Sequence, residues 1–177
     1  MSKYKYNHGF IVMRAQPFHK GHKSLVDKMF KECKNITIIF GSLQDSRSAK
    51  NPFTFEERVQ MLKNVYGRNP RFKEIAIFGL DDIPNDNEWY DYVLDNLKEK
   101  CSDFGKVDVF YCGNDEDGCW FDDSRITIEK IERTGQLGEE LISGTEIREM
   151  IKNNDLKWRR YVPRENVEFL EGLIKKS

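Results

Sequence analysis

Apolar residues along this chain gather into short runs that are separated by amphipathic segments. Continuous runs cover residues 9–13, 36–40, 75–78 and 107–111. A short run that stays apolar at successive positions is typical of a strand buried on both faces, as in a parallel sheet. Residues 125–129 alternate between apolar and polar positions instead, which predicts a fifth strand with one exposed face.

Between these runs the apolar positions recur every three or four residues, which predicts amphipathic helices. Thr54 followed by Glu57 predicts a capped helix start, since the two side chains can form a capping box. Residues 143–152 and 163–174 are also helical by pattern. The predicted inward faces are Leu25, Val26, Met29 and Phe30; Val59, Leu62 and Val65; Trp89, Tyr90, Val93, Leu94 and Leu97; and Val167, Leu170, Leu173 and Ile174.

Strands that alternate with helices predict a parallel sheet with right-handed crossovers. We therefore expect an α/β fold: a Rossmann-like, doubly wound parallel sheet of about five strands, with helices on both faces and a C-terminal helical segment at about 143–177. The 177 residues are enough for one well-buried domain and too few for two ordinary ones without a linker. One domain over residues 1–177 is the prediction.

The net charge and the lack of long apolar stretches indicate which kinds of partner and location to expect. A net charge of −1 gives no reason to expect nucleic acid or an anionic membrane as the main partner. The sequence shows no apolar stretch of membrane-spanning length and no signal-peptide core, so we expect a cytoplasmic protein. Homo-oligomerisation is also expected. The four cysteines, at positions 33, 101, 112 and 119, lack zinc-ligand spacing and are predicted to be reduced and space-filling.

Polar residues follow each of the first four predicted strands. A ligand of a doubly wound sheet lies beyond the carboxyl ends of its strands, so these residues are the candidates for chemistry. The cations lie on the first two loops, as a polyphosphate requires. In chain order, the four loops carry Arg14, Gln16, His19, Lys20 and His22; Gln44, Arg47 and Lys50; Asp81, Asp82, Asn85 and Asn87; and Gly113, Asn114 and Asp115.

Two common nucleotide-binding motifs are missing. The loop after the first strand has one glycine where the dinucleotide fingerprint needs three, and the sequence has no Gly-Lys-Ser/Thr of a P-loop. Hydride transfer and P-loop hydrolysis are therefore disfavoured. A phosphate site built from imidazoles and guanidiniums suits attack on a nucleotide phosphoryl group, where catalysis is mainly positioning and charge neutralisation.

Two segments of the chain resemble the signature motifs of a known enzyme superfamily. Residues 14–22 resemble the His-x-Gly-His signature of the nucleotidyltransferase superfamily, and residues 142–148 resemble its second signature, Ile-Ser followed by a distal Arg. Residues 44–58, 143–148 and 158–163 are similar to the archaeal-type nicotinamide mononucleotide adenylyltransferases. The resemblance implies transfer of AMP from ATP to nicotinamide mononucleotide, giving NAD⁺ and pyrophosphate. Mg²⁺ would arrive with ATP, and no protein ligand is assigned to it.

The resemblance also implies roles for individual residues. His19 and His22 would contact the ATP phosphates, and Arg14 and Arg148 would hold the β- and γ-phosphates as guanidinium forks. Trp89 would stack on the nicotinamide end of the acceptor. The implied substrate-binding set is Gln16, Phe18, Arg47, Lys50, Asp82, Asn85, Trp89, Gly113, Asn114, Ser143, Gly144 and Thr145.

Several alternatives remain open at this level. The same chemistry could serve another phosphorylated acceptor such as phosphopantetheine, or the chain could be a non-catalytic nucleotide-binding or sensing module. Ser143 and Glu146 have the spacing of a capping box, and for Glu146 this structural role is the preferred interpretation. Trp89 could pack in the core, and Arg47 and Lys50 could be solvated loop charges.

Overall fold

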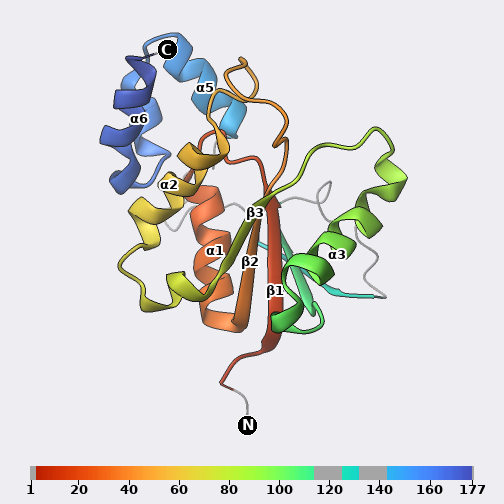
Figure 1. The fold of residues 1–177 in the computed structure, drawn as a ribbon. Coiled ribbons are helices and arrows are strands. Elements are labelled where there is room, and N and C mark those ends of the chain that lie inside the picture. Colours follow the sequence, from red (N-terminus) through yellow and green to blue (C-terminus); the bar gives the residue numbers. More distant parts are fainter. Residues whose placement is uncertain (1–2, 114–124, 132–142, 177) are drawn as a thin grey trace.

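A parallel sheet of five strands forms the centre of the molecule. The computed structural model describes residues 3–113, 125–131 and 143–176 (Figure 1). The strand order is β3-β2-β1-β4-β5, and every pairing is parallel. Each predicted run overlaps a strand: β1 (Tyr6–Met13), β2 (Cys33–Phe40), β3 (Ala76–Gly79), β4 (Val109–Cys112) and β5 (Thr127–Lys130). The predicted fold class is confirmed.

Helices cover both faces of this sheet (Figure 1). The helices are α1 (Lys20–Glu32), α2 (Phe55–Tyr66), α3 (Trp89–Lys100), α5 (Gly144–Lys152) and α6 (Val167–Ile174). Figure 1 shows α1 and α2 on one face and α3 on the other. The segment expected to be helical from 163 begins as a 3₁₀ turn, Arg164–Asn166, and continues as α6.

The core forms two layers because successive strand side chains point to opposite faces. Ile11 and Ile38 pack with α1, α2 and α6 on one face, whereas Phe10 and Ile39 pack with α3 on the other. Edge strand β5 has exposed and half-buried positions, as its alternation predicted. This two-layer core confirms the doubly wound arrangement.

The buried face of α2 differs in one respect from the predicted face. Leu62 is buried as expected, but Val59 and Val65 are only half-buried. A charged residue takes a fully buried place on this face, which hydrophobic periodicity alone does not predict. The buried residues of α2 are Arg58, Met61, Leu62 and Tyr66.

The topology fixes where a ligand can bind. The first crossover, through α1, leaves β1 toward β2, whereas β4 joins the opposite side of β1 after a crossover through α3. The strand order therefore reverses direction at β1, and such a switch point is where a doubly wound sheet opens a crevice beyond the carboxyl ends of its strands.

None of the helices in the described ranges is long and apolar enough to cross a membrane. Cys33, Cys101 and Cys112 are buried, in agreement with the space-filling role. Cys119 lies outside the described residues.

His8 lies fully buried on β1, away from the crevice. Its Nδ1–H donates to the Gly105 carbonyl at 3.3 Å, so its Nε2 accepts from the Thr37 hydroxyl at 2.8 Å. Burial lowers the pKa of His8 from its ordinary value of 6.5. The neutral ring is therefore the form that the fold requires.

We predict that His8 makes the protein acid-sensitive. Below about pH 6.5 the unfolded chain binds a proton that folded His8 resists, so the free energy of unfolding falls as pH falls, by at most about 1.4 kcal/mol per pH unit for one proton. Denaturant titrations from pH 7.5 to 5 should give a flatter pH dependence for His8→Gln than for the wild type. Both proteins keep the other two histidines, so equal slopes would contradict the prediction.

Candidate active site

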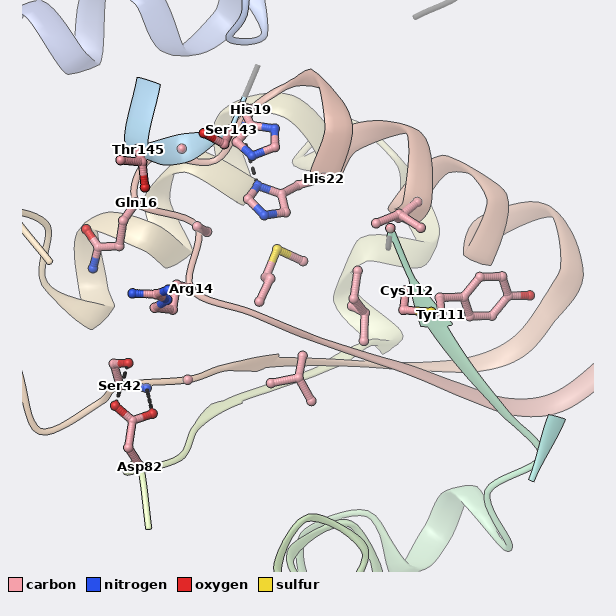
Figure 2. Close-up of a pocket in the computed structure, with 18 of the residues that line it drawn as sticks. Arg14, Gln16, His19, His22, Ser42, Asp82, Tyr111, Cys112, Ser143 and Thr145 are labelled. Atoms are coloured by element: carbon pink, nitrogen blue, oxygen red, sulfur yellow. Dashed lines mark hydrogen bonds between the residues drawn. The ribbon is translucent and has the colours of Figure 1, made fainter. Parts of the chain in front are cut away.

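A cavity of about 720 Å³ lies beyond the carboxyl ends of β1, β2 and β4. Its volume is within the range of small-molecule sites. The walls come from the turn after β1, from Gly41 and Ser42 after β2, and from Trp89 at the start of α3. The start of α5 contributes Ser143, Gly144, Thr145 and Arg148. The site predicted at the strand ends therefore exists as a single cavity (Figure 2).

The turn after β1 is fixed by one buried amide. Gln16 is 2% exposed, and its Nε2 donates to the Phe53 carbonyl while its Oε1 accepts from the Phe53 N–H, both at 2.9 Å. Ala15 adopts a left-handed backbone with φ of 50°, and the Gln16–Pro17 peptide is cis. The Gln16 amide thus ties this turn to the loop that precedes α2.

The two histidines are stacked at the start of α1, with ring centroids 3.8 Å apart. Nδ1 of His19, the N-cap residue, accepts from the Gly21 N–H at 3.1 Å, and Nδ1 of His22 accepts from the His19 N–H at 3.4 Å. Because both Nδ1 atoms are acceptors, the neutral rings carry their proton on Nε2. Each ring can therefore donate a hydrogen bond to an anion in the cavity.

Arg148 joins α5 to the turn after β1. Its Nη1 donates to the Gln16 carbonyl at 2.8 Å, and its Nη2 donates to the Thr145 hydroxyl at 3.0 Å. Burial, and then the charge of Arg14, lower the pKa of Arg148. Two guanidiniums that share a cavity wall form a site suited to phosphate oxygens.

The start of α5 has the capping box that its sequence suggested. The Ser143 hydroxyl accepts from the Glu146 N–H at 3.3 Å, and the Glu146 carboxylate accepts from the Ser143 N–H at 2.7 Å. Glu146 does not line the cavity, in agreement with its structural interpretation, whereas Ser143, Gly144 and Thr145 do.

A second polar cluster closes the other side of the cavity. Ser42 has a left-handed backbone with φ of 52°, and its N–H and hydroxyl donate to the Asp82 carboxylate at 3.2 and 2.7 Å (Figure 2). Gln44 Nε2 also donates to Asp82, at 3.1 Å. The Ser42 contacts were not anticipated, since the only signal in the sequence is a Gly-Ser pair at a strand end.

The described residues contain no group of three His, Cys, Asp or Glu side chains that could hold a metal ion. Asp82 and Asp86 line the cavity, but the Asp82 carboxylate already accepts from Ser42 and Gln44. The donors that this site offers therefore fit a divalent ion that enters on substrate phosphates better than one held by the protein alone.

A family model described as cytidylyltransferase-like matches residues 14–150, a range that spans the histidine pair and Arg148. The chain belongs to the cytidylyltransferase-like family. It is 33% identical over 162 residues to the nicotinamide-nucleotide adenylyltransferase of Methanococcus vannielii, covering 91% of this chain and 86% of the relative. The enzyme of that name from Archaeoglobus fulgidus is 31% identical over 169 residues, covering 93% and 90%. The expected archaeal-type family is therefore confirmed.

The fold has a counterpart among solved structures. A bifunctional NMN adenylyltransferase/ADP ribose pyrophosphatase from Francisella tularensis, solved with AMP and a manganese ion, superposes with a TM-score of 0.74 at 19% identity. The match covers 97% of this chain and 51% of that protein, so this cytidylyltransferase-like chain spans about half of its length. At this identity the likeness concerns the fold alone.

Most of the predicted site residues line one cavity. This set is Arg14, Gln16, His19, His22, Lys50, Asp82, Trp89, Gly113, Ser143, Gly144, Thr145 and Arg148. Asn114 lies outside the described residues.

Three predicted residues do not reach the cavity wall. Phe18 is fully buried in the core, where its N–H faces the Met61 sulfur at 3.5 Å. Arg47 is instead paired with Glu57, with Nη2 to Oε1 at 2.6 Å. Asn85 caps the short turn Asp86–Glu88, since its side chain accepts from the Asn87 N–H at 3.1 Å.

We predict that Gln16→Leu destabilises the protein strongly. The substitution leaves the buried N–H and carbonyl of Phe53 without partners, and each such group costs about 1–3 kcal/mol. Denaturant unfolding should therefore show a loss of roughly 2–4 kcal/mol. Gln60→Leu is the matched control, because Gln60 is exposed on α2 and bonds only to Asn64 among the described residues. Equal effects of the two substitutions would rule out the structural role of the Gln16 amide.

Proposed function

We propose that this nucleotidyltransferase transfers AMP from ATP to nicotinamide mononucleotide, forming NAD⁺ and pyrophosphate. The observation that carries the proposal is the convergence of both signature segments: Arg148 of α5 contacts the carbonyl of Gln16, 132 positions earlier, beside the stacked histidines. The names of the archaeal relatives support the choice of acceptor.

The chemistry is a direct in-line displacement at phosphorus. A phosphate oxygen of the acceptor attacks the α-phosphorus of ATP, the bond to the bridging oxygen breaks, and pyrophosphate leaves with that electron pair. The Nε2–H groups of His19 and His22 donate to the oxygens that gain charge, while Arg14 and Arg148 hold the departing phosphates. These groups are in place before reaction, so little reorganisation is required, and no covalent enzyme intermediate is needed.

The acceptor would lie on the Asp82 side of the cavity. Trp89 lines this wall at the start of α3 and offers a ring for stacking, while Asp82 is held toward the cavity by Ser42. The two substrates then approach from opposite sides of the turn after β1, with the reacting phosphates between them.

Mg²⁺ is the divalent ion that we propose for the reaction. It would neutralise charge on the ATP phosphates and be held by phosphate oxygens and water. Manganese accompanies AMP in the Francisella protein.

The sheet and the C-terminal helices share the candidate site. Because β1 and α5 contribute to one cavity, we propose that the sheet and the C-terminal helices act as one catalytic domain. The homo-oligomeric state and the cytoplasmic location stay predictions, which light scattering and cell fractionation would test.

We predict that purified protein forms NAD⁺ from ATP and nicotinamide mononucleotide, and that His19→Ala lowers kcat by about a hundredfold or more because one charge-stabilising donor is lost. Coupled detection of NAD⁺ measures this. His8→Gln, at the opposite end of β1, should keep kcat within about twofold near pH 7.5. Phosphopantetheine in place of the mononucleotide tests the alternative acceptor. ATP binding without turnover on either acceptor would instead favour a sensing module.

We predict that Trp89 acts on the acceptor and not on ATP. Trp89→Ala should raise KM for nicotinamide mononucleotide by roughly tenfold, since base–aromatic stacking contributes about 1–3 kcal/mol. KM for ATP should change by less than about twofold, and Trp89→Phe should recover most of the acceptor affinity. An equal rise in both KM values would show that Trp89 only supports the fold.

A further inference from the structure

Arg58 carries a buried positive charge directly behind the wall of the cavity. Its side chain is fully buried on the inward face of α2. Within the described part of the chain no carboxylate lies within 4 Å of its guanidinium, and its Nε has no hydrogen-bond partner. Burial lowers the pKa of Arg58, and the charge of Glu56, an exposed residue of α2, only partly offsets this effect. Burying an ion without a paired carboxylate is costly, so the contacts that Arg58 makes are of interest.

The contacts of Arg58 show what the fold gains. A single nitrogen, Nη1, donates to the carbonyl of Arg14 at 3.1 Å and to the carbonyl of Gly41 at 2.8 Å. These carbonyls lie just beyond the ends of β1 and β2, and both residues line the cavity. The Phe40 ring, 5.2 Å from the guanidinium carbon, supports the group from one side.

The residue after each of these carbonyls has an unusual backbone. Ala15 has φ of 50° and Ser42 has φ of 52°, and neither is glycine. Left-handed backbone is costly for such residues and persists where surrounding contacts enforce it. Arg58 holds the peptide that enters each left-handed turn, and these turns set the positions of Arg14 and of the Ser42–Asp82 pair.

We propose that Arg58 is a positioning residue for the nucleotide site: it locks the two strand-end turns together and places a positive charge, without a salt bridge to any described residue, behind the wall that receives the polyphosphate. The inference rests on the proposed function only in naming the ligand as a nucleoside triphosphate. When the anion binds, it adds opposite charge to the partial compensation that the exposed Glu56 gives, so ligand affinity and the cost of burying Arg58 are linked.

The test compares Arg58→Met with Arg71→Met. Arg71 also donates to backbone carbonyls, those of Phe30, Cys33 and Lys34, but at the amino end of β2, away from the cavity. Calorimetric titration with ATP in the absence of any acceptor measures affinity without requiring turnover. We expect Arg58→Met to weaken ATP binding by about tenfold or more, equivalent to ~1.4 kcal/mol, and Arg71→Met to change it by less than about twofold, although both lower the unfolding midpoint.

Two further variants, Arg58→Lys and Arg58→Gln, cover the case in which Arg58→Met does not fold. Arg58→Lys keeps the charge and hydrogen-bond donors, and should keep ATP affinity closer to the wild type than Arg58→Gln, which keeps a donor but not the charge. Unchanged ATP affinity in a folded Arg58→Met or Arg58→Gln protein would overturn the proposal. Because ATP binding is read directly, a protein that binds ATP but makes no NAD⁺ would overturn the proposed function and leave the role of Arg58 intact.

Discussion

The path of the chain as it leaves β1 is the constraint on which the rest of the site depends. After Met13 the chain must turn through a left-handed Ala15 and reach the N-cap of α1 at His19. The Gln16 side chain fixes this turn to the loop before α2, and the Gln16 carbonyl receives Arg148 from α5. One short turn therefore sets the relative positions of three separate segments.

Several groups of the site serve the fold and the chemistry at once. His19 caps α1 through Nδ1, and the same contact leaves the proton on Nε2 for an anion. Ser143 likewise caps α5 and lines the cavity. Helix N-termini also attract anions through their unpaired N–H groups and dipole. The starts of α1 and α5 thus each orient a side chain that lines the cavity, without separate supports.

Sequence patterns predicted the parts of this structure that depend on local order. Residues 36–40 formed a buried strand because every side chain there can be buried on a two-sided sheet. Capping boxes at Thr54 and Ser143 formed because their partners lie three residues away. The burial of Arg58 was not predicted because periodicity ranks positions by hydrophobicity. Its partners are carbonyls just beyond the ends of β1 and β2, which lie 44 and 17 positions away in the sequence. The pairing of Arg47 with Glu57 was not predicted either, because the partner of a loop charge depends on which residues the tertiary structure brings close to it.

The charge around the cavity is positive, whereas the net charge of the chain is negative. The chain carries a net charge of −1, yet among the described residues the three cations that line the cavity, Arg14, Lys50 and Arg148, outnumber the two carboxylates, Asp82 and Asp86. A further cation, Arg58, lies behind the wall. In a low-dielectric setting such repulsion between like charges costs more than it would in water. A polyanion removes this repulsion as it binds, so the same charges that weaken the empty site strengthen the filled one. The stability of the turn after β1 is therefore coupled to occupancy of the site.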